Sequence, residues 1–365
     1  MSSSLTHRIY NFSAGPAVMP RPVLEQAQRD LVALPGVGMS VMEISHRSKT
    51  FEGILARAVA DLRELTGLDE RHKVLLLQGG ASLQFSMVPM NLLGAGQTAD
   101  YIDTGSWADK AAKEAKRVGS VNVTGSTKAD HYSRIPDASE LTLTPGAAYV
   151  HITTNNTIEG TEWKEPPATG DVPLVADASS NILSRPMELR RFGLIYAGAQ
   201  KNLGPSGLTL VIVREDLLAR SSSDLPTMLN YKVQAENDSL YNTPPTFAIY
   251  LLGLTMQWLK SLGGLPGIAS INARKAAKLY AEIDRTGFYR GTARKDSRSL
   301  MNVTFRLPSE ELEKMFDKEA TANGLDGLKG HRSVGGMRAS IYNAFPEQGV
   351  EALVDFMRDF ETKRG

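Results

Sequence analysis

The stretch LIYAGAQKNLGPSGLTLVIVRE, residues 194–215, carries the most informative pattern of the chain. An apolar run ends in small residues, presents Gln200 and Lys201, and passes through a Gly- and Pro-containing turn into a second apolar run. This pattern predicts two strands, 194–197 and 208–213, joined by a loop that holds Lys201. A lysine between two buried strands is partly desolvated, which lowers its pKa and frees the amine for imine formation. The alternative is an ordinary surface lysine in a turn.

Further short apolar runs alternate with helical patterns on the N-terminal side of this stretch. They predict strands at 73–77, 100–103, 148–153 and 174–176. Between them, residues 106–118 place Ala111, Ala112 and Ala115 on one helical face, behind Ser106 as the expected cap. Strands that alternate with helices predict an α/β fold with a mostly parallel sheet covered on both faces. Functional residues of such folds gather at the carboxyl ends of the strands.

Composition excludes several classes of protein. The 365 residues have a net charge of +1, which argues against nucleic acid as the main partner, and they contain no cysteine for disulfides or thiolate metal sites. The six histidines lack metal-ligand spacing, so no metal is expected. The apolar stretch 247–259 is too short to span a membrane and predicts a buried helix. The N-terminal sequence MSSSLTHRIY has no apolar signal segment, so we expect a cytoplasmic protein.

Two segments interrupt the alternation in the C-terminal part of the chain. Residues 221–246 are mostly polar, end in Pro244-Pro245 and predict a long loop. A Gly-rich break at 263–267 follows the apolar helix, and the remaining residues predict a second, smaller domain.

Two motifs stand where predicted strands end. Asp177 ends LVAD, and a carboxylate there could keep a pyridine nitrogen protonated, although a helix cap is the commoner role of such a residue. Gly79-Gly80-Ala81-Ser82 follows the strand at 73–77 and precedes an apolar helix, which would let backbone N–H groups approach a phosphate. An ordinary strand–helix turn explains the same residues.

Aromatic and basic residues add weaker signals. Trp107 and Thr157 each follow a predicted strand, where Trp107 could stack on a planar ring and Thr157 could bind a ring substituent. Arginine matches carboxylate and phosphate geometry, and the candidate anion-binding residues form two clusters among apolar and Gly residues. The clusters are His46 with Arg47, and His331 and Arg332 with Arg338. Core packing and scattered surface charge are the competing explanations.

Eight motifs, in this order, resemble those of the phosphoserine aminotransferases, a family within class V of the pyridoxal-phosphate-dependent aminotransferases. They are NFSAGPA (11–17), MEISHRS (42–48), QGGAS (78–82), NNTIEG (155–160), DASSNILSRP (177–186), AGAQKNLGPSGL (197–208), YNTPPTFAIY (241–250) and GMRASIYNA (336–344). The resemblance implies the aspartate-aminotransferase fold (fold type I), with a seven-stranded sheet and a smaller α+β domain. It also implies a large domain of residues 17–262 and a small domain formed by residues 1–16 and 263–365.

The resemblance further implies a role for each candidate. Lys201 would hold pyridoxal 5'-phosphate as a Schiff base and shuttle a proton, while Asp177 would pair with the ring nitrogen. Trp107 would stack on the ring and Thr157 would contact its phenolic side. The phosphate would be held by Ala81, Ser82 and Gln200, and by Asn242 and Thr243 from the other subunit of a homodimer. Arg338 would bind the substrate α-carboxylate, and the second anion would be received by His46, Arg47, His331 and Arg332.

The implied reaction moves an amino group reversibly between glutamate and 3-phosphohydroxypyruvate, giving 2-oxoglutarate and O-phosphoserine, in serine biosynthesis. A related phosphorylated hydroxythreonine in pyridoxine biosynthesis is a further implied substrate. Another class V aminotransferase acting on alanine or serine is the alternative. Two positions vary within the family: some relatives have Ser where Ala14 stands and Arg where Ser82 stands.

Overall fold

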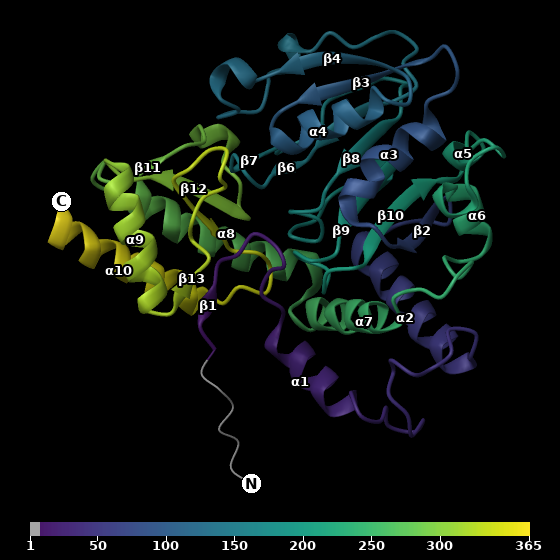
Figure 1. Cartoon of the computed structure of the whole chain (residues 1–365), viewed down its shortest axis with the longest axis horizontal. Coiled ribbons are helices and arrows are strands. Elements are labelled where there is room, and N and C mark those ends of the chain that lie inside the picture. The colour runs from purple at the N-terminus through teal and green to yellow at the C-terminus, as the bar shows by residue number, and fades with distance from the viewer. Residues whose placement is uncertain (1–7) are drawn as a thin grey trace.

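The computed structural model describes residues 8–365, which form a large α/β region and a smaller α+β region (Figure 1). A seven-stranded sheet runs through the large region. Its strands, in spatial order, are β2 (His72–Leu77), β10 (Thr209–Arg214), β9 (Leu194–Gly198), β8 (Leu174–Asp177), β5 (Val150–Thr153), β3 (Thr98–Asp103) and β4 (Ser120–Ser126). All are parallel except β10, which is antiparallel to both of its neighbours. The predicted mostly parallel sheet of seven strands is confirmed.

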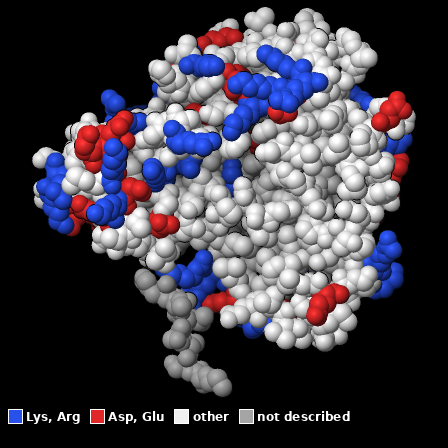
Figure 2. Space-filling model, in the orientation of Figure 1, with Lys and Arg blue, Asp and Glu red and all other residues white. Residues whose placement is uncertain are grey.

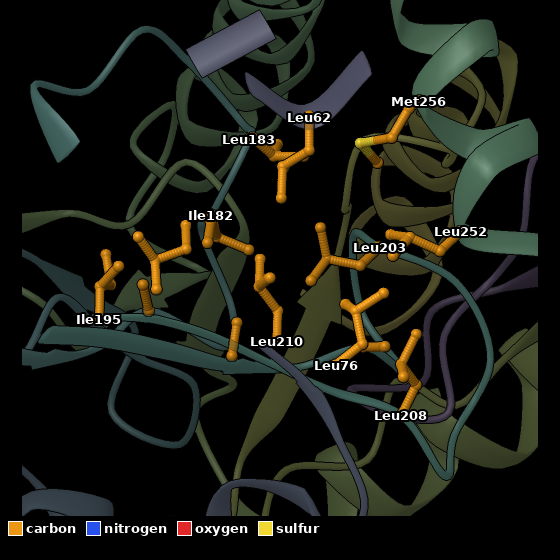
Figure 3. Packing of buried hydrophobic residues seen from close by; sticks show 14 of the residues in the cluster. Leu62, Leu76, Ile182, Leu183, Ile195, Leu203, Leu208, Leu210, Leu252 and Met256 are labelled. Carbon is orange, nitrogen blue, oxygen red and sulfur yellow. The ribbon is translucent and has the colours of Figure 1, made fainter. Parts of the chain in front are cut away.

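Alternate residues of each central strand enter two different cores, because successive side chains of a strand point to opposite faces of the sheet. In β10, Leu210 and Ile212 pack into one core, and Val211 and Val213 pack into the other. The first core contains residues of α1 (Arg21–Asp30), α2 (Lys49–Thr66) and α7 (Thr246–Ser261) (Figure 3). The second contains residues of α3 (Gly80–Leu92), α4 (Ser106–Ala115), α5 (Glu215–Leu218) and α6 (Tyr231–Glu236). Helices therefore cover both faces of the sheet.

The smaller region has its own core and its own sheet. Its helices are α8 (Gly264–Ile283), α9 (Glu310–Ala322) and α10 (Glu347–Arg364), and its sheet has the order β11 (Arg290–Gly291), β12 (Asn302–Arg306), β14 (Met337–Ser340). The N-terminal strand β1 (Tyr10–Asn11) pairs with β13 (Leu325–Asp326), and Phe12 lies in the core of this region. Residues 1–7 lie outside the described part of the chain, and the domain division at residues 16/17 and 262/263 stays a prediction.

Four local expectations need correction. The predicted loop 221–246 contains helix α6 and a short 3-10 turn at Thr227–Leu229. The break at 263–267 is shorter than expected, because α8 begins at Gly264 and tolerates Pro266 in its first turn. Ser106 is the first residue of α4 rather than its cap, and α4 ends at Ala115 instead of residue 118. Strand β4 was not predicted, because it is an edge strand with mostly exposed or half-exposed residues.

Helix α7 confirms the predicted buried helix at 247–259. Within residues 8–365, no helix combines the length and the apolar character needed to cross a membrane. The same residues contain no group of three His, Cys, Asp or Glu side chains suited to hold a metal ion.

Candidate active site

A cavity of about 330 Å³ lies where the carboxyl ends of β5, β8 and β9 approach the small region. The sequence candidates that line it are Ala81, Ser82, Trp107, Thr157, Asp177, Gln200, Lys201, His331 and Arg338. These residues come from positions as far apart as 81 and 338, and the fold brings them together at one edge of the sheet.

Lys201 lies in the loop between β9 and β10 with its amine at the cavity. The amine donates a hydrogen bond to Thr157 Oγ1 over 2.9 Å. Burial lowers the pKa of Lys201 to about 8; the charge of Asp177 raises it, and the charge of Arg338 lowers it further. The loop is anchored in the first core, because Leu203 and Leu208, which flank Gly204 and Gly207, are both buried there (Figure 3). The Lys201 amine therefore reaches the cavity from a loop whose backbone is held in place by core packing.

Asp177 is the last residue of β8 and is only 5% exposed. In the sheet it lies between Thr153 of β5 and Tyr196 of β9. Its Oδ1 accepts a hydrogen bond from the Ser179 backbone N–H over 2.9 Å. Burial raises the pKa of Asp177, whereas hydrogen bonding from the Ser179 side chain, the charge of Lys201 and the bond from the Ser179 backbone lower it. The carboxylate is thus held in a fixed orientation at the floor of the cavity, ready to pair with a cationic N–H group.

The first turn of α3 forms another part of the wall. The preceding residue, Gly79, has φ 92°, and a Cβ atom there would lie 2.4 Å from Leu83 Cδ2, so the position requires glycine. No side chain caps this helix, and Gly80, Ala81 and Ser82 line the cavity. Backbone N–H groups at an uncapped helix start are a binding site for an anion such as phosphate.

Trp107 is positioned by a residue that the sequence analysis missed. Glu159 is 6% exposed, and its Oε1 accepts hydrogen bonds from the backbone N–H of Ser106 (2.8 Å) and from its hydroxyl (2.6 Å). Burial raises the pKa of Glu159, and the two bonds from Ser106 lower it. A Cβ atom at Gly105 would lie 2.6 Å from Glu159 Oε2, so the two loops pack closely. Glu159 belongs to the NNTIEG motif, and this motif was the only feature of the sequence that could have pointed to it.

Two basic residues of the small region enter the cavity. Arg338, on β14, makes a long contact from Nη1 to the carbonyl oxygen of Thr157 (3.4 Å), and no carboxylate of residues 8–365 forms an ion pair with it. Burial lowers its pKa. In His331, Nδ1 accepts a hydrogen bond from the Ser333 N–H (3.2 Å), so the neutral imidazole carries its proton on Nε2. Both side chains can therefore donate to an anionic ligand.

The assembled groups are those of an enzyme that handles amino groups: a lysine with a low pKa, a buried carboxylate, an aromatic ring and an anion site. The class V aminotransferase family model matches residues 9–353. The chain belongs to the class V aminotransferase family. It is 56% identical over 358 residues to the phosphoserine aminotransferase of Herpetosiphon aurantiacus, an alignment that covers 98% of this chain and 99% of that protein.

Solved structures give the same result for this aminotransferase. Phosphoserine aminotransferase from Bacillus circulans subsp. alkalophilus has a TM-score of 0.97 at 55% identity, covering 99% of this chain and 100% of that one. The pyridoxal-phosphate-bound phosphoserine aminotransferase of Trichomonas vaginalis has a TM-score of 0.92 at 39% identity, covering 96% and 100% of the two chains. The predicted fold class is confirmed.

The remaining sequence candidates do not line the cavity within one chain. His46 and Arg47 lie between α1 and α2; the His46 side chain is half-buried and Arg47 is exposed. Arg332 is exposed beside His331. Asn242 lines a separate hollow near Gln78, and the Thr243 carbonyl accepts a long hydrogen bond from Gln78 Nε2 (3.5 Å).

Proposed function

We propose that this aminotransferase moves an amino group reversibly between glutamate and 3-phosphohydroxypyruvate, giving 2-oxoglutarate and O-phosphoserine. The observation that carries the proposal is the 56% identity to a phosphoserine aminotransferase over almost the full length of both chains. Arg338 and His331 at the cavity also favour a substrate with two anionic groups over alanine or serine. We further infer a cytoplasmic location from the reaction, because glutamate and 2-oxoglutarate are metabolites of that compartment.

The cofactor of this class V aminotransferase is pyridoxal 5'-phosphate, and the cavity residues fit it. The free backbone N–H groups in the first turn of α3 would bind the cofactor phosphate. The Asp177 carboxylate would pair with the protonated ring nitrogen, and Lys201 Nζ would bond to the carbonyl carbon of the cofactor. Trp107 Nε1 and Thr153 Oγ1, both in cavity-lining residues, are buried with no hydrogen-bond partner among the described residues. When bound, pyridoxal phosphate supplies a protonated ring that withdraws electrons from the substrate α-carbon.

The other steps of the reaction are assigned to individual cavity residues. Lys201 Nζ would take the proton from the substrate α-carbon and deliver it to the cofactor carbon that receives the amino group, a role that a pKa of about 8 suits. Asp177 would keep the ring nitrogen protonated. Trp107 would stack on the ring, and Thr157 would bind its phenolic side. Ala81, Ser82 and Gln200 would hold the phosphate group.

Arg338 is proposed to bind the substrate α-carboxylate. A guanidinium group that is largely removed from water and lacks a carboxylate partner is costly, and a bidentate carboxylate of the substrate offsets that cost. The second anion of the substrate is assigned to His331 and Arg332 of the same chain, with His46 and Arg47.

We propose that the active sites are shared within a homodimer, with His46, Arg47, Asn242 and Thr243 reaching the partner's cavity. Exposed apolar side chains flank these residues and support an interface there. Val32 is 84% exposed and Met42 is 62% exposed in the segment before His46, and Tyr241 is 48% exposed beside Asn242.

The reaction is tested with purified enzyme, O-phosphoserine and 2-oxoglutarate, by measuring glutamate. We expect kcat/KM for O-phosphoserine to exceed that for L-alanine and L-serine by orders of magnitude. A preference for alanine or serine would instead support the alternative class V activity.

Shared sites are tested by mixing two inactive variants. Lys201→Ala chains and chains carrying both Asn242→Ala and Thr243→Ala should regain activity in mixed dimers, because one site of each mixed dimer is intact. An enzyme that stays fully active as a monomer at high dilution would contradict the shared-site proposal.

A further inference from the structure

Helix α4 and the two residues after it contain four basic side chains, Lys110, Lys113, Lys116 and Arg117, and among these four Lys110 alone lies over an aromatic ring. Lys113 pairs with Asp109 over 2.6 Å, and Arg117 lies 3.5 Å from Glu114. Lys110 lies over the ring of Trp107, 4.2 Å from the ring centroid. Within residues 8–365, no carboxylate lies within ion-pair distance of Lys110, so its charge has no anionic partner in the chain itself.

The position of Lys110 is at the rim of the active site. Trp107 lines the cavity, whereas Lys110 is exposed and lies outside the cavity wall. In Figure 2, Lys and Arg side chains extend over the surface from the area of α4 and β4 towards the small region. An ammonium group held over an aromatic ring keeps a defined place while its N–H groups stay available to a ligand.

The charge of Lys110 also acts on His331, a residue of the small region that lines the cavity. Burial lowers the pKa of His331, and the charges of Arg338, Lys110 and Arg332 lower it further. Lys110 comes from the large region, and the other three residues come from the small region. Positive charges from both regions therefore affect the same cavity-lining residue, His331.

We propose that Lys110 is a specificity-determining residue, whose ammonium group binds the second anionic group of the substrate, a phosphate monoester, at the rim of the cavity. The inference rests on the proposed function and adds a residue to it. A phosphate dianion has three acceptor oxygens, each with more than one lone pair, so it can accept from Lys110 in addition to the histidines and arginines already assigned to it. Lys110 supplies donors from the large region, whereas His331 and Arg332 belong to the small region, and the contact with the Trp107 ring keeps Lys110 in place.

The test compares two charge-removing variants of the holoenzyme. Lys110→Met keeps an unbranched apolar side chain on Trp107, and Lys113→Met removes the neighbouring charge one turn along α4. For each we would measure kcat and KM for O-phosphoserine, the rate of the half-reaction with L-alanine, and the inhibition constant of inorganic phosphate. Alanine has no second anion and serves as the internal reference.

For Lys110→Met we expect the KM for O-phosphoserine and the inhibition constant of phosphate to rise about 3- to 10-fold, because one exposed charge contact with a dianion is lost. The kcat and the alanine rate should stay within about twofold. Lys113→Met should match the wild type, and Lys110→Arg should restore most of the loss. The effect should shrink at high salt, since the contact is solvent-exposed.

Two outcomes would overturn the inference. If Lys110→Met slows alanine as much as O-phosphoserine, Lys110 acts only by supporting Trp107. If Lys113→Met raises the phosphate inhibition constant equally, the effect is that of general surface charge. A wild-type enzyme that does not accept O-phosphoserine would refute the proposed function instead, and the phosphate inhibition constants would still decide the role of Lys110.

Discussion

Burial withdraws the amines of Lys201 in the large region and Lys275 in the small region from water, but the two amines have different surroundings. The Lys201 amine borders the cavity and donates one hydrogen bond, to Thr157. Lys275, on α8, is 1% exposed, and its amine donates to the carbonyl oxygens of three residues. These are Ile341 (3.0 Å), Tyr342 (2.7 Å) and Phe345 (3.1 Å). Every proton of the Lys275 ammonium group is therefore occupied.

Titration alone does not separate the two residues. Burial lowers the pKa of Lys201 to about 8 and that of Lys275 to about 7. A perturbed pKa indicates a functional site only when the group can also meet a ligand. What distinguishes Lys201 is the empty space beside its amine and the unused protons on it. A lysine surrounded by carbonyl oxygens instead stabilises the turn that it caps.

Lys275 also supports the loop that contains Lys201. The turn that Lys275 caps contains Tyr342 and Asn343. The Tyr342 hydroxyl donates to the Ala14 carbonyl over 2.8 Å, and the Asn343 N–H donates to Asn202 Oδ1 over 3.0 Å. Asn202 follows Lys201 directly, so the small region holds the loop in place next to the Lys201 side chain.

The largest expected effect comes from Lys201→Ala. We propose that the Lys201 amine both binds the cofactor and moves the proton, so removing it should lower kcat by about 10⁴-fold or more. The free energy of unfolding should change little, because the side chain borders a cavity. Turnover and chemical denaturation measure the two quantities, and near-normal turnover would remove Lys201 from the mechanism.

Asp177→Asn should follow, with kcat lowered about 10²- to 10⁴-fold, because the amide cannot keep the ring nitrogen protonated. The shape of the side chain and the hydrogen bond from Ser179 are retained, so stability should be nearly unchanged. Unaltered steady-state kinetics would show that Asp177 has no part in the reaction.

Lys275→Met should show the reverse pattern. It leaves three buried carbonyl groups without their donor, which should lower the free energy of unfolding by about 2–4 kcal/mol. We expect kcat to fall less than about tenfold in the folded variant. Lys278→Met is the control, because Lys278 is half-exposed and pairs with Glu351 on the surface. A Lys275→Met enzyme that is stable but inactive would contradict the claim that Lys275 serves stability rather than the reaction.

The smallest perturbation is a change of pH. In the cofactor-free protein, the Lys201 amine loses its proton as the pH rises through about 8, whereas an exposed lysine does so near 10.4. Reductive methylation at Lys201 should therefore reach half its maximal rate near pH 8. Lys275 should stay unmodified while the protein is folded, despite its low pKa, because no reagent reaches it. Mass spectrometry of the peptides reads out both sites, and equal labelling of the two would refute the comparison.

Local patterns in the sequence indicated six of the seven strands of the large sheet, its mostly parallel type, and two central residues of the cavity. Lys201 could be predicted because it stands between two apolar runs, and Asp177 because it ends another, so the alternation of strand and helix places both at the same edge of the sheet. Arg338 and His331 stood out as part of a basic cluster, but only the motifs that resemble the phosphoserine aminotransferases linked this cluster to the site of Lys201, which lies far away in sequence.

Only the tertiary structure decided which polar residues support the site. Glu159 holds Ser106 across 53 positions, and the Tyr342 hydroxyl meets the Ala14 carbonyl across 328 positions. Lys275 reads in the sequence as an ordinary lysine of an amphipathic helix, since nothing near it reveals the carbonyl groups of residues 341–345. Such contacts depend on where distant segments meet, and local hydrophobic periodicity does not encode that information.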